Sequence, residues 1–394
     1  MTPSRIAFAG LLSLAVAMGI GRFAFTPLLP LMVRDGQLDV AGGGWVAAAN
    51  YAGYLVGALT AARVRTSAGT LGIAALLGTA LLTALMALPG VPLWITLRFL
   101  AGVASAWAFV ATSVWCLGAL ARQGRSDLGG VVYTGVGTGI SLAGLYCLGA
   151  AAAGASAISL WLQLAAVSLV LALPALQAAH ALRASATARA AASSSPSLPA
   201  GTRGLVLCYG LMGFGYILPA TFLPVLARSL VDDPRLFGLA WPVFGATAAV
   251  STLLAGWAMR HASRLAVWTV CQGLMGLGVL LPSLWLNIAT IAASALLVGG
   301  TFMVITLAGV QEVRARASGD PTGPVGRLTA AFAAGQIAGP VLSSLLLHVP
   351  AFATHGLSLA LQTGALGLFA STLWLWRQVR PSSSPLPQEI SHVR

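Results

Sequence analysis

Two arginines stand inside apolar stretches, where a permanent charge is rare. Arg22 lies in "GIGRFAFTPLLP", within a run that is otherwise free of charge from Ile6 to Val33, and Arg98 lies in "LRFLAGVASA". A guanidinium keeps its charge at every physiological pH, and its planar fork of donors matches a carboxylate or phosphate through two parallel hydrogen bonds. These two side chains are therefore the first candidates for recognising an anion.

Neither arginine has an acidic partner that the sequence pattern places at the same depth. Glu312 is the one acid inside an apolar stretch, and it falls near the end of that stretch. The other acids lie in expected loops or in the tail: Asp35, Asp39, Asp127, Asp232, Asp233, Asp320 and Glu389. Backbone carbonyls, Asn50, Tyr133 and Gln336 remain open as partners. A cavity that receives an anion is therefore favoured over a structural ion pair.

Other residues are expected to surround the two arginines. Phe25 or Thr26 follows Arg22 at helical spacing, and Asn50 and Tyr54 share a face one turn apart. Ordinary packing explains each aromatic residue equally well. The predicted substrate-binding residues are Arg22, Phe25, Thr26, Asn50, Tyr54, Arg98, Tyr133, Gln336 and, from the repeat described below, Tyr216.

The helix that carries Arg22 can still enter a bilayer. A central arginine costs about 2.5 to 3.5 kcal/mol on insertion scales, and each Leu, Ile, Phe or Val returns roughly 0.3 to 0.6 kcal/mol. Thirteen such residues lie between Ile6 and Val33, so together they return on the order of 4 to 8 kcal/mol. The apolar residues therefore allow the helix to insert with Arg22, but this does not explain what the charge is for.

Composition identifies an integral membrane protein. The chain has 394 residues, of which 58% are hydrophobic and 7% are charged, whereas soluble domains have roughly 25% charged residues. A bilayer core of about 30 Å needs about 20 apolar residues per helix. The apolar runs predict twelve spans, at about 6 to 33, 41 to 62, 69 to 88, 92 to 121, 129 to 152, 156 to 179, 204 to 228, 236 to 259, 265 to 284, 287 to 313, 325 to 347 and 355 to 377.

The arginines orient these spans. All 21 basic residues are arginines, and the loops opposite the termini hold only Arg34, Arg228 and Arg235. Sixteen lie on the side of the termini: Arg5, Arg63, Arg65, Arg122, Arg125, Arg183, Arg189, Arg203, Arg260, Arg264, Arg314, Arg316, Arg327, Arg377, Arg380 and Arg394. This asymmetry predicts that both termini are cytoplasmic. The basic excess therefore follows from topology, and nucleic acid is excluded as a partner.

One long polar break divides the spans six and six. We expect an N-terminal half over residues 1–180, a flexible cytoplasmic linker over 181–203, a C-terminal half over 204–378 and a disordered cytoplasmic tail over 379–394. The linker is rich in Ala, Ser and Pro, which is typical of segments without a packed core.

The two halves carry an internal repeat. "GIGRFAFTPLLPLMVR" from Gly19 and "GFGYILPATFLPVLAR" from Gly213 align without a gap, sharing both glycines, a Leu-Pro pair and the final arginine. In this alignment Tyr216 stands where the first copy has Arg22, so we expect the two side chains to face each other across a pseudo-twofold axis. Parallel repeats of six helices are the architecture of the major facilitator superfamily, with the substrate site near the bilayer midplane between the halves.

A resemblance to a family supports this architecture. "GIGRFAFTPLLPLM" in the first span and "GQIAGPVLSS" from Gly335 in the eleventh resemble the YbfB/YjiJ-like branch of that superfamily, over essentially the whole chain. The resemblance implies an all-helical membrane fold of twelve transmembrane helices and a bacterial transporter that works by alternating access. Arg98 and Gly102 resemble a fourth-helix motif that is associated with proton-coupled members.

Gating and coupling residues are predicted at the two ends of the helices. Glu312 is expected to form a cytoplasmic latch with Arg260, Arg264 or Arg314, with a role as proton relay left open. On the opposite side Arg34 and Arg228 lie at helix ends, where a cation is favoured, and are candidates for a gate.

No cofactor, metal site or enzyme activity is expected. The four cysteines lie in apolar stretches without a CxxC pair, and the five histidines lie at helix ends, in loops or in the tail. We predict a monomeric secondary transporter of a small organic anion in the bacterial inner membrane, with protons as an open second partner. The alternative is proton-coupled efflux of drugs or sugars, and a channel or a membrane enzyme is less favoured.

Overall fold

The computed structural model describes residues 1–186, 201–228, 230, 234–349 and 355–379, and within these residues it is helical with no strand. The first segment consists of α1 (Pro3–Leu14), a π-helical turn (Ala15–Ile20) and α2 (Phe25–Arg34). The other helices are α3 (Val40–Thr60), α4 (Ala68–Leu85), α5 (Val91–Arg122), α6 (Gly129–Ala152), α7 (Ala157–Ala186), α8 (Thr202–Arg228), α9 (Pro234–Ala258), α10 (Arg264–Leu284), α11 (Ile288–Arg316), α12 (Thr322–His348) and α13 (Gly356–Gln378).

These helices follow the predicted spans to within a few residues at most ends. Ten of the segments are long and apolar enough to cross a bilayer. The other two, α3 and α9, have 21 and 25 residues, and a helix of 21 residues is about 30 Å long. The prediction of an all-helical membrane fold is therefore confirmed.

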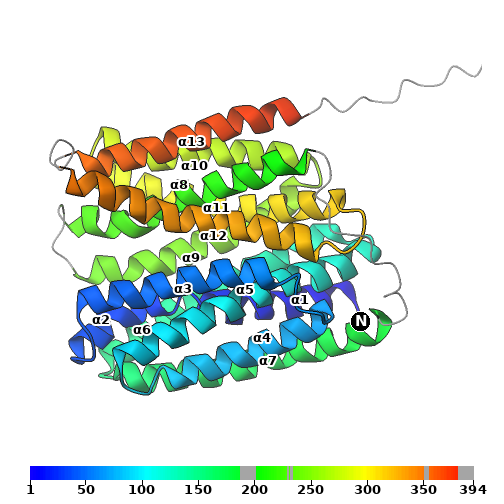
Figure 1. Cartoon of the computed structure of the whole chain (residues 1–394), viewed down its shortest axis with the longest axis horizontal. Coiled ribbons are helices and arrows are strands. Elements are labelled where there is room, and N and C mark those ends of the chain that lie inside the picture. Colours follow the sequence, from blue (N-terminus) through cyan, green and yellow to red (C-terminus); the bar gives the residue numbers. More distant parts are fainter. Residues whose placement is uncertain (187–200, 229, 231–233, 350–354, 380–394) are drawn as a thin grey trace, which may run out of the picture.

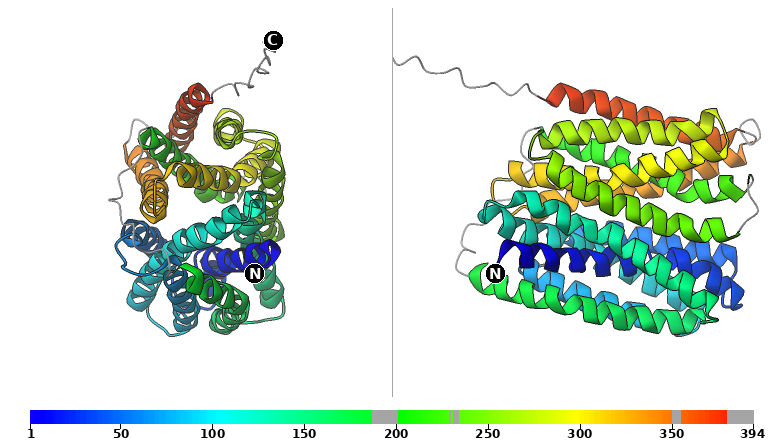
Figure 2. Two further views of the ribbon diagram at one scale, coloured as in Figure 1. Left: turned by 90° about the vertical axis from the view of Figure 1, so that its right-hand side faces the viewer. Right: turned by 180° about the vertical axis from the view of Figure 1, so that it is seen from behind.

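The helices form two groups that run side by side (Figure 1). In the left view of Figure 2, which looks along the helices, α1 to α7 lie mostly below α8 to α13. α3 packs on α5 and α4 on α7 in the first group, and α10 packs on α11 and α13 in the second. The groups meet mainly where α6 packs on α9 and α3 on α12.

The described helices extend into the predicted linker from both sides. α7 continues to Ala186 and α8 begins at Thr202, so residues 181–186 are helical where a flexible segment was expected. The alanines of this stretch explain the difference, because alanine has the highest intrinsic helix propensity. Residues 187–200 of the linker and 380–394 of the tail lie outside the described residues.

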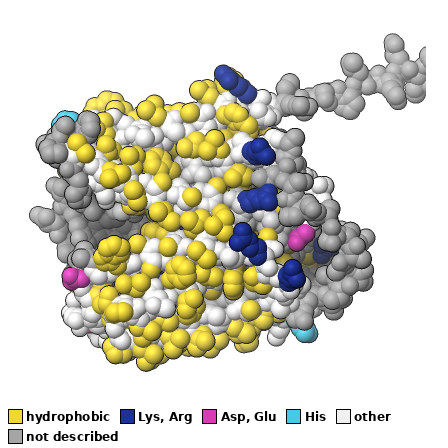
Figure 3. Space-filling view, viewed as in Figure 1, with side chains coloured by type: hydrophobic (Ala, Val, Ile, Leu, Met, Phe, Trp, Pro, Cys, Tyr) yellow, Lys and Arg dark blue, Asp and Glu magenta, His cyan; other side chains and the backbone are white. Residues whose placement is uncertain are grey.

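The surface agrees with a membrane environment. A broad band of apolar side chains covers the face seen in Figure 3, and arginine side chains gather at the end of the molecule where the N-terminus lies. Large apolar side chains stay exposed on this protein, among them Trp45 at 71% and Trp376 at 68%. Exposed apolar surface of this extent is costly in water and favourable in lipid.

The first span is interrupted at the residue of most interest. Amide N–H groups of Gly21 and Phe23 donate to carbonyls five residues earlier, those of Val16 and Met18, and residues 21–24 form turns rather than α-helix. Such a π-type insertion shifts the following residues around the helix axis and is frequent at functional sites. Sequence periodicity predicted a continuous helix here, because the apolar pattern runs unbroken through the turn.

α3, the second span, packs closely on α5 next to the break in the first span. A Cβ atom on Gly102 would lie 2.2 Å from the carbonyl oxygen of Asn50 and 2.7 Å from the amide nitrogen of Tyr54. Only glycine allows the two backbones to approach this closely. Gly102 of α5 therefore sets the distance at which α3 presents Asn50 and Tyr54.

Gly102→Ala is expected to lower the free energy of unfolding by about 1 to 3 kcal/mol, because the added methyl group overpacks the contact. The matched control is Gly78→Ala in α4, where a Cβ atom would meet nothing within 4 Å. Thermal unfolding midpoints of the two purified variants test this expectation. Equal midpoints would show that α3 and α5 do not need their present spacing.

Candidate functional site

Arg22 lies in the break of the first span and joins the two groups of helices. The residue is buried, with only 3% of its surface exposed. The Nη2 group donates a hydrogen bond to Oε1 of Gln336 on α12, and the guanidinium carbon lies 3.6 Å from the centre of the Tyr54 ring. A cation over an aromatic face is attracted by the negative face of the ring. Arg22 is thus held by one side chain from each group.

Three donors at this point have no partner. They are Nε and Nη1 of Arg22 and Nε2 of Gln336, all buried. None of the ion pairs among the described residues involves Arg22 or Arg98. Each unsatisfied buried donor costs about 1 to 3 kcal/mol, and a charged one more. An acceptor with negative charge is the group that would best satisfy such donors.

Arg98 turns its fork toward the backbone of the broken helix. Nη1 donates to the carbonyl oxygen of Gly21 at 2.8 Å, and Nη2 donates to that of Arg22 at 2.6 Å. The guanidinium carbon also lies 5.2 Å from the centre of the Phe25 ring. Asn50 in turn donates through Nδ2 to the carbonyl oxygen of Arg98 at 3.0 Å. Arg98 therefore positions the segment that carries Arg22, and both of its terminal nitrogens are used in doing so.

The predicted binding residues divide into those near the two guanidiniums and those elsewhere. Tyr54 and Gln336 contact Arg22, and Phe25 and Asn50 contact Arg98. Tyr133 hydrogen-bonds Ser113 at 2.6 Å instead. The side chain of Thr26 is exposed, because the helix resumes at Phe25 with a changed rotation and Phe25 takes the buried position.

Sequence reasoning missed the aromatic residues that complete the site. Phe23 and Tyr51 place their ring centres 5.3 and 5.9 Å from the guanidinium carbon of Arg22. Phe23 also makes an edge contact with Trp241 of α9, at 5.9 Å between ring centres. No motif marks these residues, since aromatic side chains are also common in ordinary membrane packing.

Glu312 forms its ion pairs within the second group of helices. It pairs with Arg316 at 2.8 Å and with Arg264 at 4.0 Å. The expected pairing with Arg264 is thus present, whereas no ion pair joins Glu312 to Arg260 or Arg314 in the described part of the chain. The pair with Arg264 joins the end of α11 to the start of α10, and the pair with Arg316 lies within α11.

Arg34 at the opposite end fastens α2 to α7. Its Nη2 lies 2.8 Å from Oδ1 of Asp35, and Nη2 also donates to the carbonyl oxygen of Ala155 at 2.8 Å. The amide of Ala157 donates to Asp35, and this bond, together with Arg34, lowers the pKa of the Asp35 carboxyl. A gate between Arg34 and Arg228 stays a prediction, because the side chain of Arg228 lies outside the described residues.

The two groups of helices touch at the end where the chain begins. Nε2 of Gln311 on α11 donates to the carbonyl oxygen of Ser126 at 3.2 Å. Gly326 of α12 comes so near to α3 that a Cβ atom on it would lie 2.8 Å from the carbonyl oxygen of Ala58. These two contacts use a neutral side chain and backbone, whereas Arg314 of α11 brings a charged group to α5, where a Cβ atom on Gly118 would lie 3.3 Å from its Nη2.

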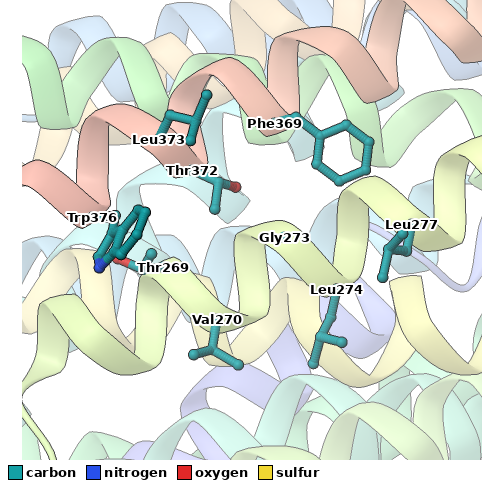
Figure 4. Close-up of a pocket in the computed structure, with 9 residues that line it drawn as sticks. All are labelled: Thr269, Val270, Gly273, Leu274, Leu277, Phe369, Thr372, Leu373 and Trp376. Atoms are coloured by element: carbon teal, nitrogen blue, oxygen red, sulfur yellow. The ribbon is translucent and has the colours of Figure 1, made fainter.

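An open groove on the outer surface between α10 and α13 is not a competing anion site. Figure 4 shows its lining, which is apolar except for Thr269 and Thr372. Both threonine hydroxyls donate to carbonyls of their own helices, those of Leu265 and Leu368. The side chains of this groove therefore offer no charge and no free hydroxyl donor.

Comparison with known proteins shows which family the chain matches. The family model described as "Uncharacterised MFS-type transporter YbfB" matches residues 14–375, which confirms the resemblance seen in the sequence. Among solved structures, the human organic anion transporter MFSD10 (TETRAN) aligns with a TM-score of 0.70 at 16% sequence identity, covering 95% of this chain and 100% of that chain. At this identity the likeness shows a shared fold. No curated protein matches the chain.

Arg98→Lys is expected to lower the free energy of unfolding by about 1 to 3 kcal/mol, because a single ammonium cannot replace a planar fork and leaves a buried carbonyl without its donor. The matched control is Arg63→Lys, at an exposed position after α3. Thermal unfolding midpoints measure the difference. A loss no larger than that of the control would mean that the two carbonyls do not depend on Arg98.

Glu312→Gln is expected to leave any substrate-driven pH change in proteoliposomes intact. The carboxylate is engaged by two arginines whose side chains are 27% and 38% exposed, and such pairs contribute about 0.2 to 1 kcal/mol to stability. A dye inside the vesicles reports the pH change, with Asp320→Asn as the control. A signal that disappears only in the Glu312 variant would identify Glu312 as a proton relay.

Proposed function

The chain belongs to the YbfB-type family of major facilitator transporters, and we propose that it moves a small organic anion across the membrane by alternating access. One observation carries the choice of an anion: the buried guanidinium of Arg22 has two donors without partners and no carboxylate paired with it among the described residues. The fold shared with MFSD10, which is described as an organic anion transporter, is consistent with this choice.

The chemistry of binding follows from the free donors. Nη1 of Arg22 can donate to a carboxylate, and it forms a bidentate pair with Nη2 once Nη2 leaves Oε1 of Gln336. Nε2 of Gln336 can donate to the same anion. Oε1 of Gln336 accepts from Arg22 in the present structure, so it serves as a neutral substitute for one anionic oxygen. When the anion binds, Arg22 would exchange the neutral oxygen of Gln336 for a negatively charged oxygen, which is the stronger acceptor.

The location of these donors suits alternating access. We assign Arg22 to an N-terminal half, residues 1–180, and Gln336 to a C-terminal half, residues 204–378. An anion held by both side chains contacts both halves, so its binding energy can favour their rearrangement. In the present structure the halves are in contact at the end where the chain begins, through Gln311 and Ser126.

The proposed setting is the bacterial inner membrane, with a monomer as the working unit and both termini in the cytoplasm. Support for the orientation comes from the arginines, which are concentrated in loops on the side of the termini. Figure 3 shows basic side chains gathered at that end of the visible face. The residues proposed for gating or coupling stay Arg34, Arg228, Arg260, Arg264 and Glu312, and the contacts of Arg34 and of Glu312 in this structure lie within one half each.

Arg22→Lys is expected to weaken binding of the transported anion by about 10- to 100-fold, because one charge-assisted hydrogen bond of about 1.5 to 3 kcal/mol is lost with the fork. Proteoliposomes loaded with monocarboxylates, dicarboxylates and sugar acids measure uptake and exchange. Arg63→Lys at equal abundance is the control. Unchanged transport in the Arg22 variant, or transport of neutral sugars or cations alone by the wild type, would refute the proposal.

The orientation has its own test. Green fluorescent protein fused after Arg394 is expected to fluoresce in bacterial cells, because it matures when the C-terminus is cytoplasmic. Alkaline phosphatase fused at the same point is expected to be inactive there. An active phosphatase with a dark fluorescent fusion would place the termini on the other side and reverse the assignment of the two ends.

A further inference from the structure

A wall of aromatic side chains lies on the C-terminal side of the site. We define the aromatic wall as Tyr216 of α8, Trp241 and Phe244 of α9, Phe302 of α11 and Phe332 of α12. Tyr216 stacks on Phe302 with ring centres 5.0 Å apart, and Phe244 stacks on both Phe302 and Trp241 at 5.2 and 5.5 Å. Phe332 joins them with its ring centre 6.0 Å from that of Tyr216, so five rings from four helices form one continuous cluster.

This wall adjoins Arg22 along two paths. Phe23, the neighbour of Arg22, contacts Trp241 at 5.9 Å. Phe332 lies one helical turn before Gln336 on α12, so the two side chains share a face of the helix. Both are buried. Gln336 in turn accepts the hydrogen bond from Arg22. Tyr216 also occupies, in the internal repeat, the position that corresponds to Arg22.

The two sides of the site therefore differ in chemistry. The N-terminal side contributes the guanidinium of Arg22 with its free donors, beside Phe23, Tyr51 and Tyr54, and the wall contributes aromatic rings with no charged group. A ligand that satisfies both sides has an acidic group at one end and a flat apolar ring at the other. A second negative charge on the ligand would face the wall without a counter-ion, and that arrangement is costly.

We propose that the transported anion is an aromatic monocarboxylate, bound with its carboxylate at Arg22 and Gln336 and with its ring against the aromatic wall. This inference rests on the proposed function and narrows its substrate class. Aromatic rings prefer offset stacking or edge contacts with other rings, which adds to the gain from burying their area. Dicarboxylates and sugar acids lack the ring and are expected to bind more weakly.

Binding to the purified wild-type protein tests the inference without any variant. Four probes separate the two halves of the ligand: phenylacetate, cyclohexylacetate, succinate and phenylacetamide. Phenylacetate is expected to bind about 3- to 10-fold more tightly than cyclohexylacetate, which has the same carboxylate and a similar size but no aromatic face. Succinate and the neutral amide are expected to bind more weakly still. Isothermal titration calorimetry measures the four affinities.

Phe302→Leu gives the matching change in the protein. It is expected to remove most of the preference for phenylacetate over cyclohexylacetate while leaving binding of carboxylates in place. The control is Phe109→Leu, which truncates a buried ring that packs on Tyr133 in the N-terminal side at 5.8 Å and should keep the preference. Phe244→Leu serves as a second wall variant if Phe302→Leu does not yield folded protein.

The outcomes distinguish this inference from the proposed function. Equal affinities for phenylacetate and cyclohexylacetate, or tighter binding of succinate, would overturn the aromatic class and leave an anion transporter. Binding of phenylacetamide as tight as that of phenylacetate would overturn the anion site itself. Absence of binding by all four probes would overturn both.

Discussion

The hydrogen bonds from Arg98 to the carbonyls of Gly21 and Arg22 are the contact on which the site depends. A break in a membrane helix exposes carbonyl groups where no water is available, and each unsatisfied group costs several kcal/mol. A guanidinium supplies two donors in one plane, at the spacing of neighbouring carbonyls. The turn at residues 21–24 can therefore exist inside the protein, and this turn directs Arg22 toward α12.

The same contact explains why two buried cations are tolerated close together. Arg98 is compensated by backbone carbonyls, and Arg22 is compensated in part by the Tyr54 ring and by Gln336. Taking a cation out of water costs several kcal/mol even after relaxation. The two guanidiniums differ in how fully this cost is met, because Arg22 keeps two free donors and Arg98 keeps only Nε. The difference supports the proposal that Arg22 recognises the anion, whereas Arg98 holds the backbone of the turn.

Much of the fold could be predicted from the sequence, whereas only part of the candidate site could. Twelve apolar runs and one polar break were sufficient for the helices, because span length and hydropathy are local properties. Arg22 was identified as a candidate site residue because a charge in an apolar run is rare. The role of Arg98 was not predictable, since it depends on a π-type turn that leaves the apolar pattern unchanged. The exposure of Thr26 was not predictable for the same reason, since spacing along a regular helix does not give the rotation that follows an irregular turn. Tyr133 lies in the regular helix α6, and its hydrogen bond to Ser113 could not be read from spacing.

The aromatic wall shows a second limit of sequence reasoning. Trp241, Phe244 and Phe302 lie in separate helices and carry no motif, so only the packing of α9 against α11 brings their rings together. Gln336 was considered as a partner for the guanidiniums because it is a polar residue in an apolar stretch. A lone polar residue is conspicuous in a membrane span, and one more aromatic residue is not.

The hydrogen bonds by which Arg98 holds the first helix go to main-chain atoms, and this has a consequence for how such proteins diversify. The carbonyls of residues 21 and 22 are present whatever side chain residue 22 carries, so the grip does not depend on the identity of that side chain. A substitution at position 22 therefore leaves the acceptors that Arg98 uses in place. If Arg22 recognises the anion as proposed, a single mutation at this position could change the ligand while the turn is kept.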